Sequence, residues 1–204
     1  MTRKTRIPGR HNLSNALGAF KLAKSLGINE TSILAALSKY RGAWRRMEYK
    51  GQLKIPDSRL QILVYDDYGH HPTEVRATLQ GFREKFPKHR LICVFQPHQI
   101  ERLKLLFKEF IRAFDEADAL ILLDVYKVKG RESKVSHNVS SEKLAQVVSK
   151  RKNGPKEIIY LPHPKDLAHV INSILNSKFY ILNSAVVVMM GAGDIVNLTP
   201  RLLK

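Results

Sequence analysis

Short apolar runs that alternate with helix-length segments are the feature that most restricts the fold of this 204-residue chain. Five runs have the length and composition of buried strands, at residues 60–66, 91–95, 119–124, 157–161 and 185–190. Helices are expected between and after them, at residues 72–85, 100–114, 140–150, 164–176 and 194–203. This order predicts an α/β fold, in which a mostly parallel, Rossmann-like sheet carries helices on both faces.

The start of the chain follows a helical pattern without strands. Apolar side chains recur at helical spacing in residues 13–26. A second helix is expected at residues 29–40, with Asn29 or Thr31 as its cap. The sequence therefore predicts a short helical segment before the sheet.

A change of pattern near residue 46 marks a domain boundary. Residues 48–55 are typical of an antiparallel edge strand, joined to the next strand by a turn at residues 56–59. We therefore divide the chain into a helical unit at residues 1–46 and an α/β domain at residues 47–204.

The chain carries a large excess of positive charge. It has 35 Lys and Arg residues against 18 Asp and Glu residues, which gives a formal net charge of +17. Such an excess attracts polyanions, so nucleic acid and a small phosphorylated substrate are both candidate partners, and a solvated lysine surface is the plain alternative. Few aromatic residues lie among the basic ones, so we expect no platform for stacked bases and no specific nucleic-acid partner.

Composition also predicts the cellular compartment. No apolar run reaches the length of about 18 residues that a membrane span needs, and the first residues lack the apolar stretch of a signal peptide. The single cysteine, Cys93, excludes an internal disulfide framework and lies in an apolar strand run. These features predict a cytoplasmic protein without a membrane partner.

The sequence YDDYGHHPTE, at residues 65–74, gathers polar groups where a strand ends and a helix begins. Ligands of open parallel sheets bind beyond the carboxyl ends of the strands, and a helix N-terminus favours anions. The side chains that could contact a nucleotide here are Asp66, Asp67, Tyr68, His70 and His71. A hydrogen-bonded turn without a ligand is the alternative. We predict no metal site, because adjacent histidines rarely point at one ion and no cysteine pair assists them.

Later strand ends carry further candidates. His98 and Arg102, in FQPHQIERLK, are four residues apart and would suit a carboxylate or a phosphate if the helix has begun at His98. A capped helix with a solvated arginine is an equal alternative. The segment DVYKVKGRES at residues 124–133 could close over the same edge. The glycines of MGAGD, at residues 190–194, could admit a ligand, although their spacing alone favours a plain strand-to-helix turn.

Six motifs occur in one order along the chain: PGRHNLSNALGA, WRRMEYKG, YDDYGHHPTE, FQPHQIER, DVY and MGAGD. Together they resemble the Mur ligase family over almost the whole chain. DDYGHHPTE is specific for the members that join L-alanine to UDP-N-acetylmuramate and for those that recycle murein tripeptide. FQPH and DVY favour the former.

The resemblance implies an ATP- and Mg²⁺-dependent ligase reaction that proceeds through an acyl phosphate. It also implies that residues 1–46 end a central ATPase domain and that residues 47–204 form the carboxy-terminal domain. No GxxxxGK[ST] phosphate loop occurs in the sequence, and the magnesium ligands of the central domain are missing too. We therefore expect a fragment that is inactive alone and needs the family's amino-terminal domains. A non-catalytic remnant that binds anions or nucleotides is the alternative.

The resemblance further implies a role for single residues. In the family, two asparagines meet the adenine, an aspartate meets the ribose and an arginine lies near the ATP phosphates. The expected nucleotide-binding set is Asn12, Asn15, Arg46, Asp67, Tyr68 and His70.

The resemblance also implies a catalytic set. His98 and Arg102 match groups beside the muramoyl carboxylate and the incoming alanine. The expected catalytic residues are Arg46, His70, His98 and Arg102. The family commonly has an arginine where this chain has Gln99, which weakens one anion contact.

Overall fold

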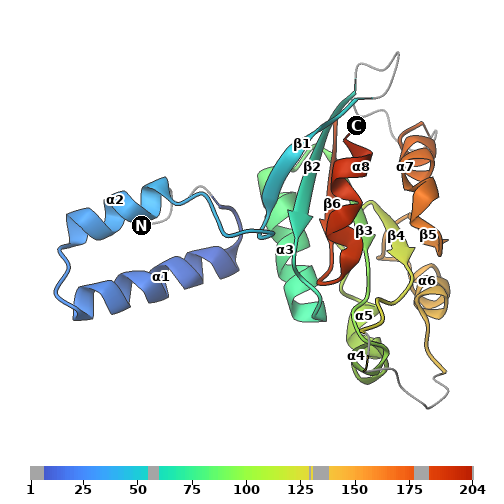
Figure 1. Cartoon of the computed structure of the whole chain (residues 1–204), viewed down its shortest axis with the longest axis horizontal. Helices are drawn as coiled ribbons and strands as arrows, with labels where there is room; N and C mark the ends of the chain where they lie inside the picture. Colours follow the sequence, from blue (N-terminus) through green and yellow to red (C-terminus); the bar gives the residue numbers. More distant parts are fainter. Residues whose placement is uncertain (1–6, 55–59, 129, 131–137, 177–183, 204) are drawn as a thin grey trace.

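A six-stranded sheet forms the centre of the chain, with the strand order β1-β2-β6-β3-β4-β5 (Figure 1). The computed structural model describes residues 7–54, 60–128, 130, 138–176 and 184–203. The strands are β1 (Glu48–Leu53), β2 (Gln61–Asp67), β3 (Arg90–Phe95), β4 (Ala119–Leu123), β5 (Glu157–Leu161) and β6 (Ser184–Met190). β1 pairs with β2 in antiparallel fashion at one edge, and the other neighbours are parallel. The predicted α/β fold, with a mostly parallel sheet and one antiparallel edge strand, is therefore confirmed.

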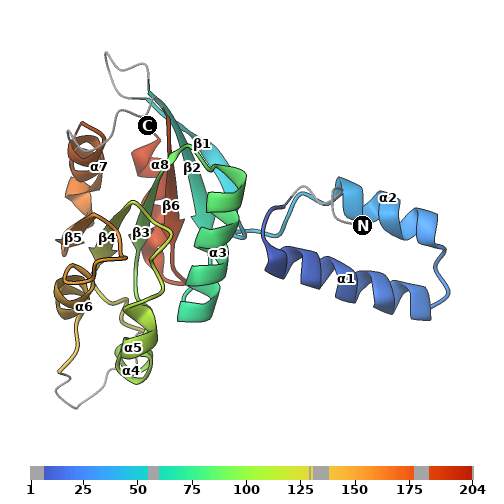
Figure 2. The ribbon, with the colours of Figure 1, turned by 180° about the vertical axis from the view of Figure 1, so that it is seen from behind.

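Helices cover both faces of the sheet (Figures 1 and 2). The helices on one face are α3 (Pro72–Lys85), α4 (Ile100–Leu105), α5 (Phe107–Phe110) and α6 (Ser141–Val148). The helices on the other face are α7 (Leu167–Leu175), the 3₁₀ helix η2 (Asp194–Asn197) and α8 (Thr199–Leu202). In β6, Val186 and Val188 belong to the first core, whereas Val187 and Met189 belong to the second. Because successive strand residues point to opposite faces, a strand covered on both sides is apolar throughout.

Two helices, α1 (Arg10–Ser25) and α2 (Glu30–Lys39), form a hairpin that projects from the sheet (Figures 1 and 2). Gly27 has a φ of 84°, a left-handed conformation that ends α1 without steric cost. The side chain of Asn29 accepts a hydrogen bond from the N–H of Ser32 at 2.9 Å and so caps α2. The two predicted helices are confirmed, with Asn29 rather than Thr31 as the cap.

Three predicted helices are interrupted. The helix predicted at residues 100–114 is divided into α4 and α5, because Leu106 leaves helical geometry with a ψ of 23°, and residues 111–114 form turns. Residues 164–176 begin as the 3₁₀ helix η1 (Pro164–Asp166) before α7. Residues 194–203 divide into η2 and α8, and Pro200 fits the first turn of α8 because that turn needs no N–H donor there. No helix in the described part of the chain is long and apolar enough to span a bilayer.

Some sequence predictions fall outside the described residues. The predicted strand at residues 48–55 is present as β1, which ends at Leu53. Residue 55 and the turn predicted at residues 56–59 are not among the described residues. The same holds for residues 129 and 131–133 of the segment that follows β4.

Candidate functional site

The carboxyl ends of β2, β6 and β3 lie side by side, so the loops that follow them share one edge of the sheet. Asp67 at the end of β2 is paired with Met190 of β6, and Met190 is paired with Phe95 of β3. The loop after β4 joins this edge, because the N–H of Tyr126 donates to the carbonyl of Pro97 at 2.8 Å. Four of the sequence motifs therefore meet here.

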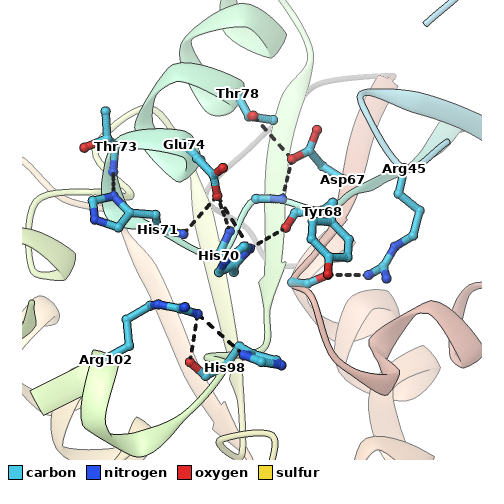
Figure 3. A network of polar contacts seen from close by, with 12 residues as sticks. Arg45, Asp67, Tyr68, His70, His71, Thr73, Glu74, Thr78, His98 and Arg102 are labelled. Atoms are coloured by element: carbon cyan, nitrogen blue, oxygen red, sulfur yellow. Dashed lines mark hydrogen bonds and ion pairs between the residues drawn. The ribbon is translucent and has the colours of Figure 1, made fainter. Parts of the chain in front are cut away.

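Asp67 lies at this edge and is buried, with only 1% of its surface exposed. One carboxylate oxygen accepts from the N–H of Met47 at 2.9 Å. The other accepts from the N–H of Gly69 at 2.8 Å and from the hydroxyl of Thr78 at 3.4 Å (Figure 3). Burial raises the pKa of Asp67, and these hydrogen bonds and the charge of Arg46 oppose the rise.

A cavity of about 780 Å³ lies beside Asp67, between the α1–α2 hairpin and α3. Its lining includes Asn12, Asn15, Arg46 and Asp67, so the structure brings four of the predicted nucleotide residues together. Its apolar wall contains the small side chains of Ala16, Ala19, Ala36, Ala43 and Ala77. The volume lies within the range of about 300–1,000 Å³ that is typical of small-molecule sites. The cavity can hold a ligand of nucleotide size.

The other predicted site residues form a second group outside the cavity lining. Tyr68 meets His70 edge to face with 5.5 Å between ring centroids, and His70 lies 5.9 Å from His98 by the same measure. Nδ1 of His70 is 3.0 Å from the carbonyl oxygen of Tyr68 (Figure 3). A carbonyl can only accept, so Nδ1 of His70 is the donor in this contact, and in the neutral form of the ring Nε2 is then an acceptor.

His98 and Arg102 come together, but not on one helix face. The condition for a shared face, that the helix has begun at His98, is not met, because α4 begins at Ile100 as predicted and Gln99 adopts a left-handed φ of 67° before it. The guanidinium of Arg102 nevertheless reaches back to Nδ1 of His98 at 3.5 Å and to its carbonyl at 3.4 Å (Figure 3). The ring of His98 also stacks on Tyr126, with centroids 5.4 Å apart and an angle of 20° between planes. The pair presents an imidazole and a guanidinium at the sheet edge.

His71 serves the helix rather than a ligand. Its Nδ1 accepts from the N–H of Thr73 at 3.3 Å, and its own N–H donates to Glu74 at 3.2 Å, which completes a capping box at the start of α3. Glu74 also accepts from the N–H of His70 at 3.0 Å. Burial raises the pKa of Glu74, but the amides of His70 and His71, together with the ring of His70 and the charge of Arg46, outweigh it, so the pKa lies below its usual value. The sequence hypothesis that His71 meets phosphate therefore has no support in this geometry.

The glycines of MGAGD make room for protein side chains. A Cβ at Gly193 would lie 2.5 Å from Cγ of Tyr126 and 2.6 Å from Oε1 of Gln96, closer than any real contact. Gln96 in turn donates to Asp194 at 2.7 Å and accepts from the N–H of Ile195 at 3.1 Å. The strand-to-helix turn favoured by the spacing is the better interpretation of this motif.

Several residues around the site escaped the sequence analysis. The cavity lining also includes His11, Thr73, Glu74 and Thr78. The burial of His11 lowers its pKa, with Asp67 opposing the shift. Only its position beside Asn12 in the first motif could have indicated this role. Arg45 was missed too, because no pattern marks an arginine as buried.

The described residues offer no ready metal site. Among them, no group of three or more His, Cys, Asp and Glu side chains could hold an ion. The two oxygens of Asp67 accept hydrogen bonds from Met47, Gly69 and Thr78.

Comparisons with curated proteins agree with the sequence motifs. A family model described as "Mur ligase, glutamate ligase domain" matches residues 45–193. The chain is 36% identical over 196 residues to a UDP-N-acetylmuramate–L-alanine ligase of Nitrosomonas eutropha, a match that spans 96% of this chain and 39% of that protein. A Clostridium perfringens ligase of the same name is 37% identical over 198 residues and is likewise covered to 39%. The chain thus spans about two fifths of the length of these relatives.

Solved structures give the same result. UDP-N-acetylmuramate-alanine ligase of Thermotoga maritima superposes with a TM-score of 0.72 at 27% identity, over 97% of this chain and 38% of that one. A murein peptide ligase of Psychrobacter arcticus superposes with a TM-score of 0.61 at 26% identity, over 96% of this chain and 36% of that one. With the domain match to most of its length, the chain belongs to the Mur ligase family.

Proposed function

We propose that this chain supplies the nucleotide-closing and acceptor-facing part of an ATP-dependent ligase that joins L-alanine to UDP-N-acetylmuramate. The observation that carries the proposal is the placement of the Asn12–Asn15–Arg46–Asp67 cavity beside the His70–His98–Arg102 group. The names of the Nitrosomonas and Clostridium relatives support this choice of substrates.

The cavity suits the nucleotide half of the reaction. Its alanine wall can face an adenine, while the amide of Asn15 and the side-chain oxygen of Asn12, whose NH₂ group donates to the carbonyl of Pro8, can supply polar contacts. An ionised carboxylate has about four acceptor positions, so Asp67 can take a ribose hydroxyl besides its three protein donors. The side chain of Arg46 is 47% exposed, so its guanidinium is accessible to phosphate oxygens. A carboxylate oxygen of Glu74 is 3.9 Å from its Nη1. Bound Mg²⁺ would neutralise phosphate charge, and its ligands would come mainly from outside the described residues.

The second group suits the acceptor half. Arg102 offers a guanidinium to a carboxylate or an acyl phosphate. The Nδ1 atom of His98 accepts from Arg102, so the proton of the neutral His98 ring is on Nε2, which can donate to the same substrate group. Nε2 of His70 is an acceptor that can take a proton from the amine of L-alanine as the nitrogen attacks the acyl carbon and phosphate leaves. Gln99 stands half-buried beside them, so this chain has fewer cations here than the family pattern.

The reaction also requires a loop that binds the transferred phosphate. The sequence contains no GxxxxGK[ST] loop, so another segment has to supply it for turnover. The helical unit at residues 1–46 would then adjoin the ATPase part, and residues 47–204 would close over it as a mobile domain. The alternative is a remnant that binds nucleotide without turnover.

The test separates these two possibilities. The 204-residue chain should release no ADP above a blank with ATP, Mg²⁺, UDP-N-acetylmuramate and L-alanine. A chimera in which this chain replaces the matching segment of the Clostridium perfringens ligase should release ADP only when both substrates are present. Coupled ADP detection and mass spectrometry of the product measure both results. Turnover by the chain alone would refute the prediction, a folded but silent chimera would indicate a remnant, and use of murein tripeptide in place of L-alanine would indicate the recycling activity.

A further inference from the structure

Arg45 is a buried arginine in the segment that joins the α1–α2 hairpin to the sheet, and it is only 2% exposed. Its N–H donates to a carboxylate oxygen of Glu48 at 2.9 Å, and its carbonyl accepts from the N–H of Tyr68 at 2.6 Å. One terminal nitrogen of the guanidinium donates to the carbonyl of Gly191 (Figure 3). Arg45 therefore contacts the ends of both β2 and β6.

The guanidinium of Arg45 also packs against aromatic rings. Its carbon lies 5.1 Å from the ring centroid of Tyr68 and 5.5 Å from that of Trp44. The guanidinium of Arg46 lies 5.6 Å from the same Tyr68 ring. Two cations thus share one ring, although they repel each other. The cation–π attraction to that ring helps to offset the repulsion.

The backbone around Arg46 is held in an uncommon shape. Arg45 and Met47, on either side, have left-handed φ values of 52° and 48°. Such values are uncommon for residues other than glycine, and they persist only where the surroundings fix them. Here the bond from Tyr68 fixes Arg45, and the bond to Asp67 fixes Met47. Arg46 therefore lies between two residues, Arg45 and Met47, whose backbones are held by hydrogen bonds.

Stability alone does not favour this arrangement. Nε of Arg45 is buried and has no hydrogen-bond partner among the described residues. Burying an incompletely paired guanidinium is unfavourable, and apolar side chains of similar volume commonly stabilise such a position as well or better. The contacts of Arg45 instead connect the segment that carries Arg46 with the loop that carries His70.

We propose that Arg45 is a positioning residue, which holds Tyr68 and thereby sets Arg46 toward the nucleotide cavity and His70 toward His98. The part that concerns Arg46 rests on the proposed function, whereas the part that concerns His70 does not. Lysine should not replace arginine here, because a single ammonium group cannot take the place of a planar guanidinium that lies near the ring of Tyr68 and donates to Gly191.

The first experiment uses the 204-residue chain and the variant Arg45→Lys, with Arg41→Lys at an exposed position as the matched control. Trp44 is the only tryptophan, so its emission reports on the guanidinium beside it. Arg45→Lys should shift the Trp44 emission and the ring resonances of His70 in NMR spectra, with the His70 signals assigned through His70→Gln. Arg41→Lys should change neither. Unchanged His70 resonances in a folded Arg45→Lys variant would overturn the proposal.

The second experiment uses the chimera. Arg45→Lys should raise the KM for ATP about tenfold, equivalent to about 1.4 kcal/mol, with kcat changed by less than about threefold. In an Arg46→Ala background the same change should have almost no further effect, because Arg45 acts through Arg46. An unchanged KM with lower thermal stability, or effects that simply add, would assign Arg45 a purely structural role. If the parent chimera is inactive, the proposed function fails, and the His70 resonances still decide whether Arg45 positions that loop.

Discussion

Replacement of Asp67 by asparagine should lower the free energy of unfolding of the 204-residue chain by about 2–3 kcal/mol. The wild-type carboxylate accepts hydrogen bonds from Met47, Gly69 and Thr78 on its two oxygens. An asparagine of the same shape has one oxygen and one NH₂ group, so at least one backbone N–H would face another donor in a buried place. The two backbone partners, Met47 and Gly69, belong to different segments. The change should therefore loosen the segment that joins the α1–α2 hairpin to β1 (the linker) as well as the loop after β2.

Urea denaturation followed by circular dichroism measures this change, and Asp166→Asn is the control. Asp166 is exposed, so that variant should stay within about 0.5 kcal/mol of the wild type. An equally small effect of Asp67→Asn would show that the three hydrogen bonds do not hold the linker. In the chimera, Asp67→Ala and His70→Ala should both raise the KM for ATP. If both leave it unchanged while stability falls, the loop has a structural role only.

Most of the sheet could be predicted because its strands are buried on both faces. A strand such as β6 has no polar residue between Ala185 and Met190, and such a run has few alternatives once helices surround it. Helix interruptions could not be predicted in the same way. Leu103, Phe107 and Phe110 keep helical spacing across the break at Leu106, so the apolar pattern contains no sign of it.

The candidate site shows a similar division. The positions of Asp67, His70 and His98 at strand ends were enough to predict that they share one edge, because parallel strands place their carboxyl ends together. The sequence did not reveal which polar groups are used up by the protein itself. His71 caps α3, and three of the alanines that line the cavity, Ala36, Ala43 and Ala77, lie outside the motifs. Such assignments depend on three-dimensional neighbours rather than on local pattern.

The two adjacent aspartates of this motif face opposite sides of β2 and meet different surroundings. Asp67 accepts from three donors, whereas one oxygen of Asp66 accepts from the hydroxyl of Thr199 in α8. The other oxygen of Asp66 is buried and has no hydrogen-bond partner among the described residues. Burial raises the pKa of Asp66, while Thr199, Lys50 and Arg45 oppose the rise. The charged form of Asp66 is thus less favourable in the folded chain than in the unfolded chain.

Asp66→Asn should therefore gain stability relative to the wild type as the pH rises. A raised pKa means that the folded chain holds the Asp66 proton more tightly than the unfolded chain. That contribution is complete below the ordinary aspartate value and is lost as the pH rises through the folded pKa of Asp66. Each unit of pKa difference is worth about 1.4 kcal/mol, and asparagine keeps the acceptor for Thr199 without any titration.

Denaturation of both proteins between pH 4 and pH 7 gives the difference directly, because groups common to both cancel. The free energy of unfolding of Asp66→Asn minus that of the wild type should increase toward neutral pH. The same difference should stay constant for the exposed control Asp166→Asn. A constant difference, or one that shrinks as the pH rises, would mean that Asp66 is ionised without penalty. In that case water would have to donate a hydrogen bond to the unpaired oxygen of Asp66 in solution.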